Sequence, residues 1–313
     1  GKALQKNGIA KTRGVKGAAS LCALAAFLYL FSKNLLTLLV SLLMGLRVEG
    51  STLANPVGFS PQAVEMLNLL VGIGAIVIPV LWLLRSTRLE PEDMRVVLPA
   101  PWSPSLCLPL FLGVANAGNL FGSLLARMTG ATSAGSLLPS GGSALLLCFI
   151  SLCIVPAIVE ELFFRGALQG LMRPSGSAPA IFAPALLFAL LHLDLAQGIT
   201  AFLCGLFLGW LAERTGSILP GMLLHFVNNS LAFLSLYLRS YAPANAAMAY
   251  DLFLLIATPL LALWLLWRAR GQGFRFSAGL RPGVEPQTVF SSPAYTVAVV
   301  FLVVLAVYTR QLR

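Results

Sequence analysis

Long apolar runs dominate this sequence and limit the folds that it can adopt. A run of roughly 20 apolar residues has the length of an α-helix that crosses the hydrocarbon core of a bilayer. Successive runs of this kind predict nine membrane helices, at Ala18–Leu46, Met66–Leu84, Leu106–Ala126, Ser143–Phe164, Ala178–Leu193, Leu195–Ala212, Ile218–Leu238, Leu252–Trp267 and Tyr295–Tyr308. The first run contains Lys33 and Asn34, and we expect one tilted helix with a snorkelling lysine there.

The composition supports the same fold class. Of the 313 residues, 58% are hydrophobic, against the roughly 45 to 50% that is usual in soluble domains, and the mean hydropathy is +0.86. The predicted fold is therefore all-α, a polytopic transmembrane helical bundle in a lipid bilayer. We divide it into N-terminal helices with a basic N-terminus at 1–142, a catalytic helical core at 143–240, and C-terminal helices at 241–313.

Basic residues outnumber acidic ones by 21 to 11, and the excess predicts an orientation in the membrane. With a cytoplasmic N-terminus, 15 basic residues fall on inside segments and five on outside segments, as the positive-inside rule requires. Because these residues lie between apolar runs, we assign them to topology and expect no nucleic-acid partner. The five cysteines all lie in apolar segments without a CxxC pair, which indicates neither disulfides nor a thiolate metal site. Gly118 with Gly122, and Gly205 with Gly209, have the spacing of helix-packing pairs.

Ionisable residues inside the apolar runs are the main functional signal. A charged residue in a membrane helix costs about 2.5 to 3.5 kcal/mol on insertion scales, so its presence suggests a function. The fourth run ends in "VEELFFRG", with Glu160, Glu161 and Arg165. The chain has only two histidines, His192 in "FALLHLD" and His225 in "LLHFVNN". Either histidine alone would more often be a hydrogen-bonded packing residue, but the carboxylates change those odds.

The spacing of these residues predicts which of them share a helix face and a membrane depth. Glu161 and Arg165 are four apart, so an ion pair between them would make both less costly to bury. Glu160 points about 100° away and stays available. Two further pairs have the same spacing of four, Phe188 with His192 and His225 with Asn229. Counted at the helical rise from the predicted cytoplasmic ends, four polar residues share roughly one layer of the membrane: Glu160, His192, His225 and Asn229, at about 20, 21, 12 and 18 Å.

These residue types are suited to hydrolysis by an activated water. A buried carboxylate with an imidazole nearby can take a proton from water. A second histidine with an asparagine amide can donate hydrogen bonds to a developing oxyanion. A serine nucleophile is less well supported, because the sequence has no GxSxG.

Three short motifs carry a family resemblance. "EELFFR", "FALLH" and "HFVNN" resemble, in order, the EExxxR, FxxxH and HxxxN motifs of the CAAX prenyl protease and bacteriocin-processing family of intramembrane glutamic proteases. The resemblance covers roughly Ser143 to Tyr237. It implies an all-helical bundle whose conical cavity opens to the cytosol and the lipid.

The resemblance also implies roles for individual residues. Glu160 would be the principal catalytic carboxylate, with His192 assisting water activation, and His225 and Asn229 would form the oxyanion site. Glu161, Arg165 and Phe188 would support the site or position the substrate. The implied mechanism needs no cofactor. A zinc-dependent version, with Glu160, His192 and His225 as ligands, is left open, although the sequence has no HExxH.

The resulting expectation is an endopeptidase that cleaves a membrane-associated, C-terminally tagged or leader-tagged protein entering from the membrane or the cytosol. The Ala- and Leu-rich composition favours a prokaryotic inner membrane as its location. The alternative is a non-enzymatic membrane protein, such as an immunity factor, a transporter or a partner protein, whose polar cluster joins helices. A transporter should show an internal inverted repeat, and we find none in the sequence.

Overall fold

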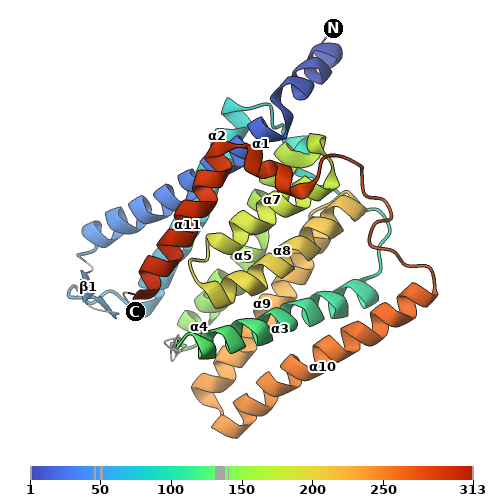
Figure 1. Cartoon of the computed structure of the whole chain (residues 1–313). Helices are drawn as coiled ribbons and strands as arrows, with labels where there is room; N and C mark the ends of the chain where they lie inside the picture. The colour runs from blue at the N-terminus through green and yellow to red at the C-terminus, as the bar shows by residue number, and fades with distance from the viewer. Residues whose placement is uncertain (1, 46, 50–51, 131–137, 140, 312–313) are drawn as a thin grey trace.

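The described part of the chain is helical apart from one small hairpin. The computed structural model describes residues 2–45, 47–49, 52–130, 138–139 and 141–311 (Figure 1). In the hairpin, β1 (Arg47–Glu49) pairs antiparallel with β2 (Thr52–Ala54). The longest helices are α1 (Lys2–Leu43), α2 (Pro61–Ser86), α3 (Pro104–Met128), α8 (Leu195–Thr215), α9 (Leu219–Tyr241) and α10 (Ala244–Gly271). The all-α prediction is confirmed.

Seven helical stretches in the described residues are long and apolar enough to cross a membrane. They are α1 from Gly14 onward, α2, α3, the stretch Gly142–Ser175, α8, α9 and α10. Two shorter apolar helices, α7 (Ser177–Leu190) and α11 (Pro293–Gln311), occupy the other two predicted spans. With 14 residues, α7 rises only about 21 Å, short of the roughly 30 Å of the hydrocarbon core. Helices thus occupy all nine predicted apolar runs, and seven of them have full spanning length; Leu46, the last residue of the first run, lies outside the described residues.

The first predicted span forms one helix, as expected. α1 continues without interruption through Lys33 and Asn34, both of which are exposed. The Asn34 amide donates to the Leu30 carbonyl, so the polar side chain bonds within its own helix. The kink in α1 lies at Gly14, where φ is +46°, a value that glycine adopts without strain.

The helices pack in a chain of neighbours that surrounds the segment 142–175. α10 lies beside α3, α3 beside α8, and α8 beside α7, while α1 packs against α2 and α11 (Figure 1). Glycines allow the closest of these approaches. A Cβ on Gly118 would come within 2.8 Å of Thr200, and one on Gly122 within 2.7 Å of the Ala196 carbonyl, so α3 and α8 are in backbone contact. The packing role predicted for Gly118 and Gly122 is confirmed.

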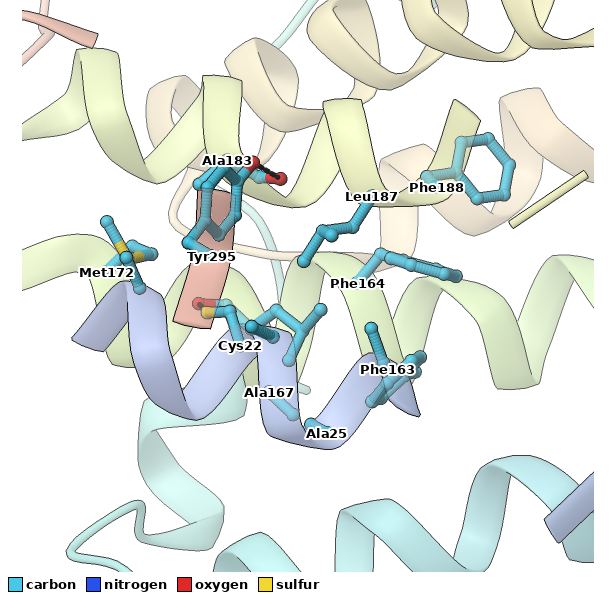
Figure 2. Close-up of a cluster of buried hydrophobic side chains, with 14 of the residues drawn as sticks. Cys22, Ala25, Phe163, Phe164, Ala167, Met172, Ala183, Leu187, Phe188 and Tyr295 are labelled. Carbon is cyan, nitrogen blue, oxygen red and sulfur yellow. Dashed lines mark hydrogen bonds between the residues drawn. The ribbon is translucent and has the colours of Figure 1, made fainter. Parts of the chain in front are cut away.

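The main apolar core lies where α1, α7 and α11 meet the segment 142–175 (Figure 2). α1 contributes small side chains there, including Cys22 and Ala25, which bring its backbone close to the phenyl rings of Phe163 and Phe164. At the other end of this core the hydroxyl of the buried Tyr295 donates to the Ala183 carbonyl at 2.8 Å (Figure 2). α11 is therefore tied to α7 by a buried hydrogen bond as well as by packing.

Candidate functional site

The helical segment that carries the two glutamates is irregular at both sides of them. It consists of α4 (Gly142–Phe149), a π-helical turn at Ile150–Ile154, α5 (Val155–Glu160), a second π-helical stretch at Glu161–Leu168, and α6 (Gln169–Met172). The first π-turn ends at Ile154, two residues before Pro156. In a regular α-helix the proline ring would clash with a carbonyl of the preceding turn. The second begins between Glu160 and Glu161, so the helix widens where the carboxylates stand. Such π-bulges are frequent at functional sites.

Glu161 lies in the centre of a buried charged triad. Its side chain is fully buried, and its Oε1 is 3.1 Å from Nη1 of Arg165, one helical turn away. The same oxygen is 2.9 Å from Nδ1 of His225 on α9. The Arg165 guanidinium also lies over the Phe188 ring, with 4.6 Å between its central carbon and the ring centroid. The Arg165 charge, itself held by a cation–π contact, and the hydrogen bond from His225 thus reduce the cost of burying this carboxylate.

Glu160 faces a different way and keeps access to its surroundings. Its side chain is 25% exposed, and its Oε2 lies 3.6 Å from Nε2 of His225. The two glutamates therefore approach opposite nitrogens of one imidazole ring, which is itself only 9% exposed. Tyr29 on α1 is close enough to Glu160 for an electrostatic interaction and packs 6.0 Å from the Phe163 ring. The sequence analysis did not identify Tyr29 as a neighbour of Glu160, because nothing in an apolar run indicates which helix will lie beside that residue.

His192 stands just past the end of α7, beside Phe188. The two rings meet edge to face, 4.9 Å apart, and the Phe188 ring centroid is also 6.3 Å from that of His225. Phe188 thus contacts both histidines and the Arg165 guanidinium. His192 Nδ1 lies 2.7 Å from the Phe188 carbonyl oxygen. The histidine is exposed, unlike His225.

These contacts fix the protons of both imidazoles. A carbonyl oxygen can only accept, so Nδ1 of His192 carries the proton and its Nε2 is an acceptor in the neutral ring. Nδ1 of His225 likewise donates to the Glu161 carboxylate, which directs Nε2 toward Glu160. Both histidines therefore present Nε2 for chemistry.

Asn229 lies on α9 four residues after His225 and is partly buried. Within the described residues it forms no hydrogen bond, so its amide group has no protein partner to hold it. The helical spacing places it on the face that carries His225, one turn further along.

Two glycines make room for the buried triad. A Cβ on Gly205 of α8 would lie 3.3 Å from Nη2 of Arg165 and 3.0 Å from Ala185. A Cβ on Gly221 of α9 would lie 3.2 Å from Oε2 of Glu161. Gly205 was predicted only as a packing residue, and the structure shows that one of its packing partners is the site arginine.

A second buried carboxylate, Glu213 in the last turn of α8, was missed by the sequence reasoning. It accepts hydrogen bonds from Gln169 at 3.0 Å, from the Ser177 hydroxyl at 3.0 Å and from Nε of Arg173 at 2.9 Å. Arg281 lies 3.3 Å from its other oxygen. The carboxylate thus joins α6, α7, α8 and the segment before α11. Glu213 directly follows the predicted run Leu195–Ala212, so it was not counted among the ionisable residues within a run, whereas α8 continues to Thr215.

Arg95, after the turn Pro91–Met94, completes this second cluster. Its Nη1 is 3.7 Å from Glu213, and its backbone bonds to Ile218 at the start of α9. Burial and then the neighbouring Arg173 lower the pKa of Arg95, whereas Glu213 opposes the shift. The cluster joins the ends of several helices. Among the described residues, none of its members has a hydrogen bond or an ion pair with Glu160 or with either histidine.

The zinc-dependent alternative names Glu160, His192 and His225 as metal ligands. No group of three or more His, Cys, Asp or Glu side chains in the described ranges is arranged to hold a metal ion, and this includes Glu160, His192 and His225.

Comparison with known proteins gives a family match over the segment that carries the site. The model of a family described as type II CAAX prenyl endopeptidase Rce1-like matches residues 142–231. That segment runs from α4 into α9 and includes Glu160, His192, His225 and Asn229. No curated protein and no solved structure gives a significant match. Residues 142–231, under a third of the chain, are thus similar to the type II CAAX prenyl endopeptidase Rce1-like family.

Proposed function

We propose that the chain is an intramembrane endopeptidase in which Glu160 activates a water molecule for attack on a peptide bond. The observation that carries the proposal is the placement of Glu160 3.6 Å from Nε2 of His225, above a triad that holds His225 from its other side. A partly exposed carboxylate next to a fixed imidazole is positioned to act as a general base toward a bound water molecule. The substrate is a membrane-associated protein with a C-terminal tag or a leader segment, cleaved in a prokaryotic inner membrane.

The reaction follows from the atoms that these residues present. Glu160 takes a proton from water while Nε2 of His192, an acceptor, orients the same water. The water oxygen bonds to the scissile carbonyl carbon, and the carbonyl oxygen becomes an oxyanion. The proton then passes from Glu160 to the amide nitrogen, the C–N bond breaks, and a carboxylic acid and an amine leave.

His225 and Asn229 stabilise the oxyanion in this proposal. The Asn229 amide supplies N–H donors, and its freedom from other hydrogen bonds in the described residues leaves them available. His225 supplies a further donor through Nε2 when its ring is protonated, and its Nδ1 contact with Glu161 holds the ring in place. The enzyme needs no metal in this scheme.

The test compares protein termini in membranes that contain the native chain or Glu160→Gln. Glu65→Gln, a part-buried carboxylate on α2 away from the site, is the matched control. We expect new termini with the native chain and with Glu65→Gln but none with Glu160→Gln, and the same termini after treatment with a chelator. Loss of the termini with chelator, and their return with added zinc, would support the zinc-dependent enzyme. Identical termini in all membranes, with equal amounts of inserted protein, would contradict the proposal and favour a non-enzymatic role.

A further inference from the structure

Tryptophan and arginine side chains gather at one end of the bundle, away from the catalytic residues. Four of the five tryptophans of the chain lie there: Trp102 just before α3, Trp210 near the end of α8, and Trp264 and Trp267 near the end of α10. α3 packs against both α8 and α10, so these helix ends are neighbours (Figure 1). Tryptophans concentrate at the level of lipid headgroups, where an apolar ring and a polar N–H are both satisfied.

An apolar cavity of about 350 Å³ opens among these helix ends. Its walls are mainly the side chains of Trp102, Leu106, Trp210, Leu211 and Phe274, and the exposed Ser103 stands at its rim. This volume lies within the range of small-molecule sites, which is roughly 300 to 1,000 Å³. The walls are suited to a hydrocarbon chain.

Arg214 holds the wall of this cavity in place. Its Nη1 donates to the carbonyls of Arg275 and Ala278, at 3.1 and 2.9 Å. Its guanidinium also lies over the rings of Trp210 and Phe274, at 5.7 and 5.4 Å. The segment after α10 is thereby fastened to α8, and a positive charge stands beside an otherwise apolar cavity.

A second hollow, of about 500 Å³, lies next along the chain and has two arginines in its lining. Trp267, Arg268, Arg270, Gly271 and Gln272 line it. Only Gly273 separates its last lining residue, Gln272, from Phe274 in the wall of the apolar cavity. An apolar hollow therefore adjoins a basic one, the arrangement that an amphipathic anion requires.

The positive charge at this end is not compensated. The sequence has no acidic residue between Asp251 and Glu285. In the described part of the chain, none of Arg214, Arg268, Arg270 and Arg275 forms an ion pair with a carboxylate. Glu213, the nearest acidic residue in sequence to Arg214, is occupied by Arg173 and Arg281. Arg268, Arg270 and Arg275 are exposed and free to meet an anion.

We propose that the two hollows together form a binding site for an anionic phospholipid. One acyl chain enters the cavity between Trp102, Trp210 and Phe274, and the phosphate lies against Arg268, Arg270 and Arg275. Basic pockets between membrane helices recognise anionic headgroups in this way. The site is separate from Glu160 and the histidines, so lipid binding can be tested independently of the proposed protease activity.

The test is native mass spectrometry of the full chain in detergent with added phosphatidylglycerol or phosphatidylcholine. We expect the native chain to retain phosphatidylglycerol at least about 10-fold more strongly than phosphatidylcholine, and Arg268→Gln/Arg270→Gln/Arg275→Gln to lose that preference. Arg127→Gln, an exposed arginine at the opposite end of α3, is the charge control and should keep it.

A second pair of variants tests the acyl-chain cavity without altering charge. Ser103→Trp places an indole at the rim of the cavity, whereas Ser105→Trp removes the same Ser103–Ser105 hydrogen bond without lining the cavity. We expect phosphatidylglycerol binding to fall in the first variant alone. Equal binding of the two lipids, unchanged binding in the triple arginine variant, or full competition by inorganic phosphate would each overturn the proposal.

Discussion

The Glu161 carboxylate accepts a hydrogen bond from His225 Nδ1 at 2.9 Å, across 64 residues of sequence and between two membrane helices. The same carboxylate oxygen pairs with Arg165 at 3.1 Å. This contact orients the imidazole so that its other nitrogen faces Glu160. Glu161 therefore acts through His225, as a positioning residue.

Substitution of Glu161 should lower turnover more than it affects substrate binding. Glu161→Gln keeps the size of the side chain but removes the carboxylate that holds the His225 ring through Nδ1. By comparison with other groups that orient a reactive imidazole, we expect kcat to fall by about 10- to 100-fold with little change in KM. Peptide-cleavage assays in proteoliposomes would measure both constants, with Glu65→Gln as the control. A rise in KM alone would assign Glu161 to substrate binding.

Removal of Arg165 should be costly for stability. Arg165→Met would leave the fully buried Glu161 carboxylate without its cation, which typically costs about 3 to 5 kcal/mol of unfolding free energy. Arg239→Met is the matched control, because Arg239 pairs with Asp251 at 2.6 Å but is 61% exposed. Loss of an exposed pair should cost at most about 1 kcal/mol. Denaturant unfolding in detergent would compare the two, and equal losses would contradict the role assigned to Arg165.

Gly221 should tolerate no side chain. In Gly221→Ala the new Cβ would lie 3.2 Å from Oε2 of Glu161, so the carboxylate must shift and its contact with His225 weakens. We expect lower activity and a loss of stability of about 1 to 3 kcal/mol. Gly72→Ala in α2 is the matched control, because its Cβ would meet no atom within 4 Å. That helical substitution should be neutral or stabilise by up to about 1 kcal/mol. Activity assays and thermal unfolding on both variants would decide, and similar behaviour of the two would show that the Gly221 contact is unimportant.

Glu213 should stabilise the fold without taking part in catalysis. Glu213→Gln would remove the only carboxylate that Arg173 and Arg281 pair with among the described residues, and we expect a loss of about 3 to 5 kcal/mol. Arg281→Gln serves as the comparison, since its side chain is 47% exposed and its loss should cost at most about 1 kcal/mol. Unfolding curves would measure the difference. At temperatures where Glu213→Gln remains folded its kcat should match that of the native chain, and a lower kcat there would place Glu213 in the catalytic mechanism.

The helical fold could be predicted from local sequence because a membrane makes it a local property. A backbone in hydrocarbon must satisfy its own hydrogen bonds, so a long apolar run has little choice but to form a helix. The run that includes Lys33 and the run Ser143–Phe164 both became parts of continuous helical paths. The lengths of the helices did not all follow from the apolar runs. α7 lies among other helices and need not cross the whole bilayer by itself.

Part of the site was equally local. Glu161 and Arg165 are four residues apart, and the helical period alone brings them together. The same spacing set Phe188 against His192. The motifs that these pairs form were enough to indicate a protease family, and the family match covers the same segment.

The sequence by itself thus determined the helices, the polar residues within them and the pairs that share a helix face. Only the tertiary structure decided that Glu161 holds His225, that Glu160 meets the other nitrogen of that ring, and that Gly221 leaves room for both. It also placed Tyr29 beside Glu160 and gathered three arginines around Glu213. Such contacts depend on the rotation and crossing of whole helices, which many distant side chains set together and no local pattern records.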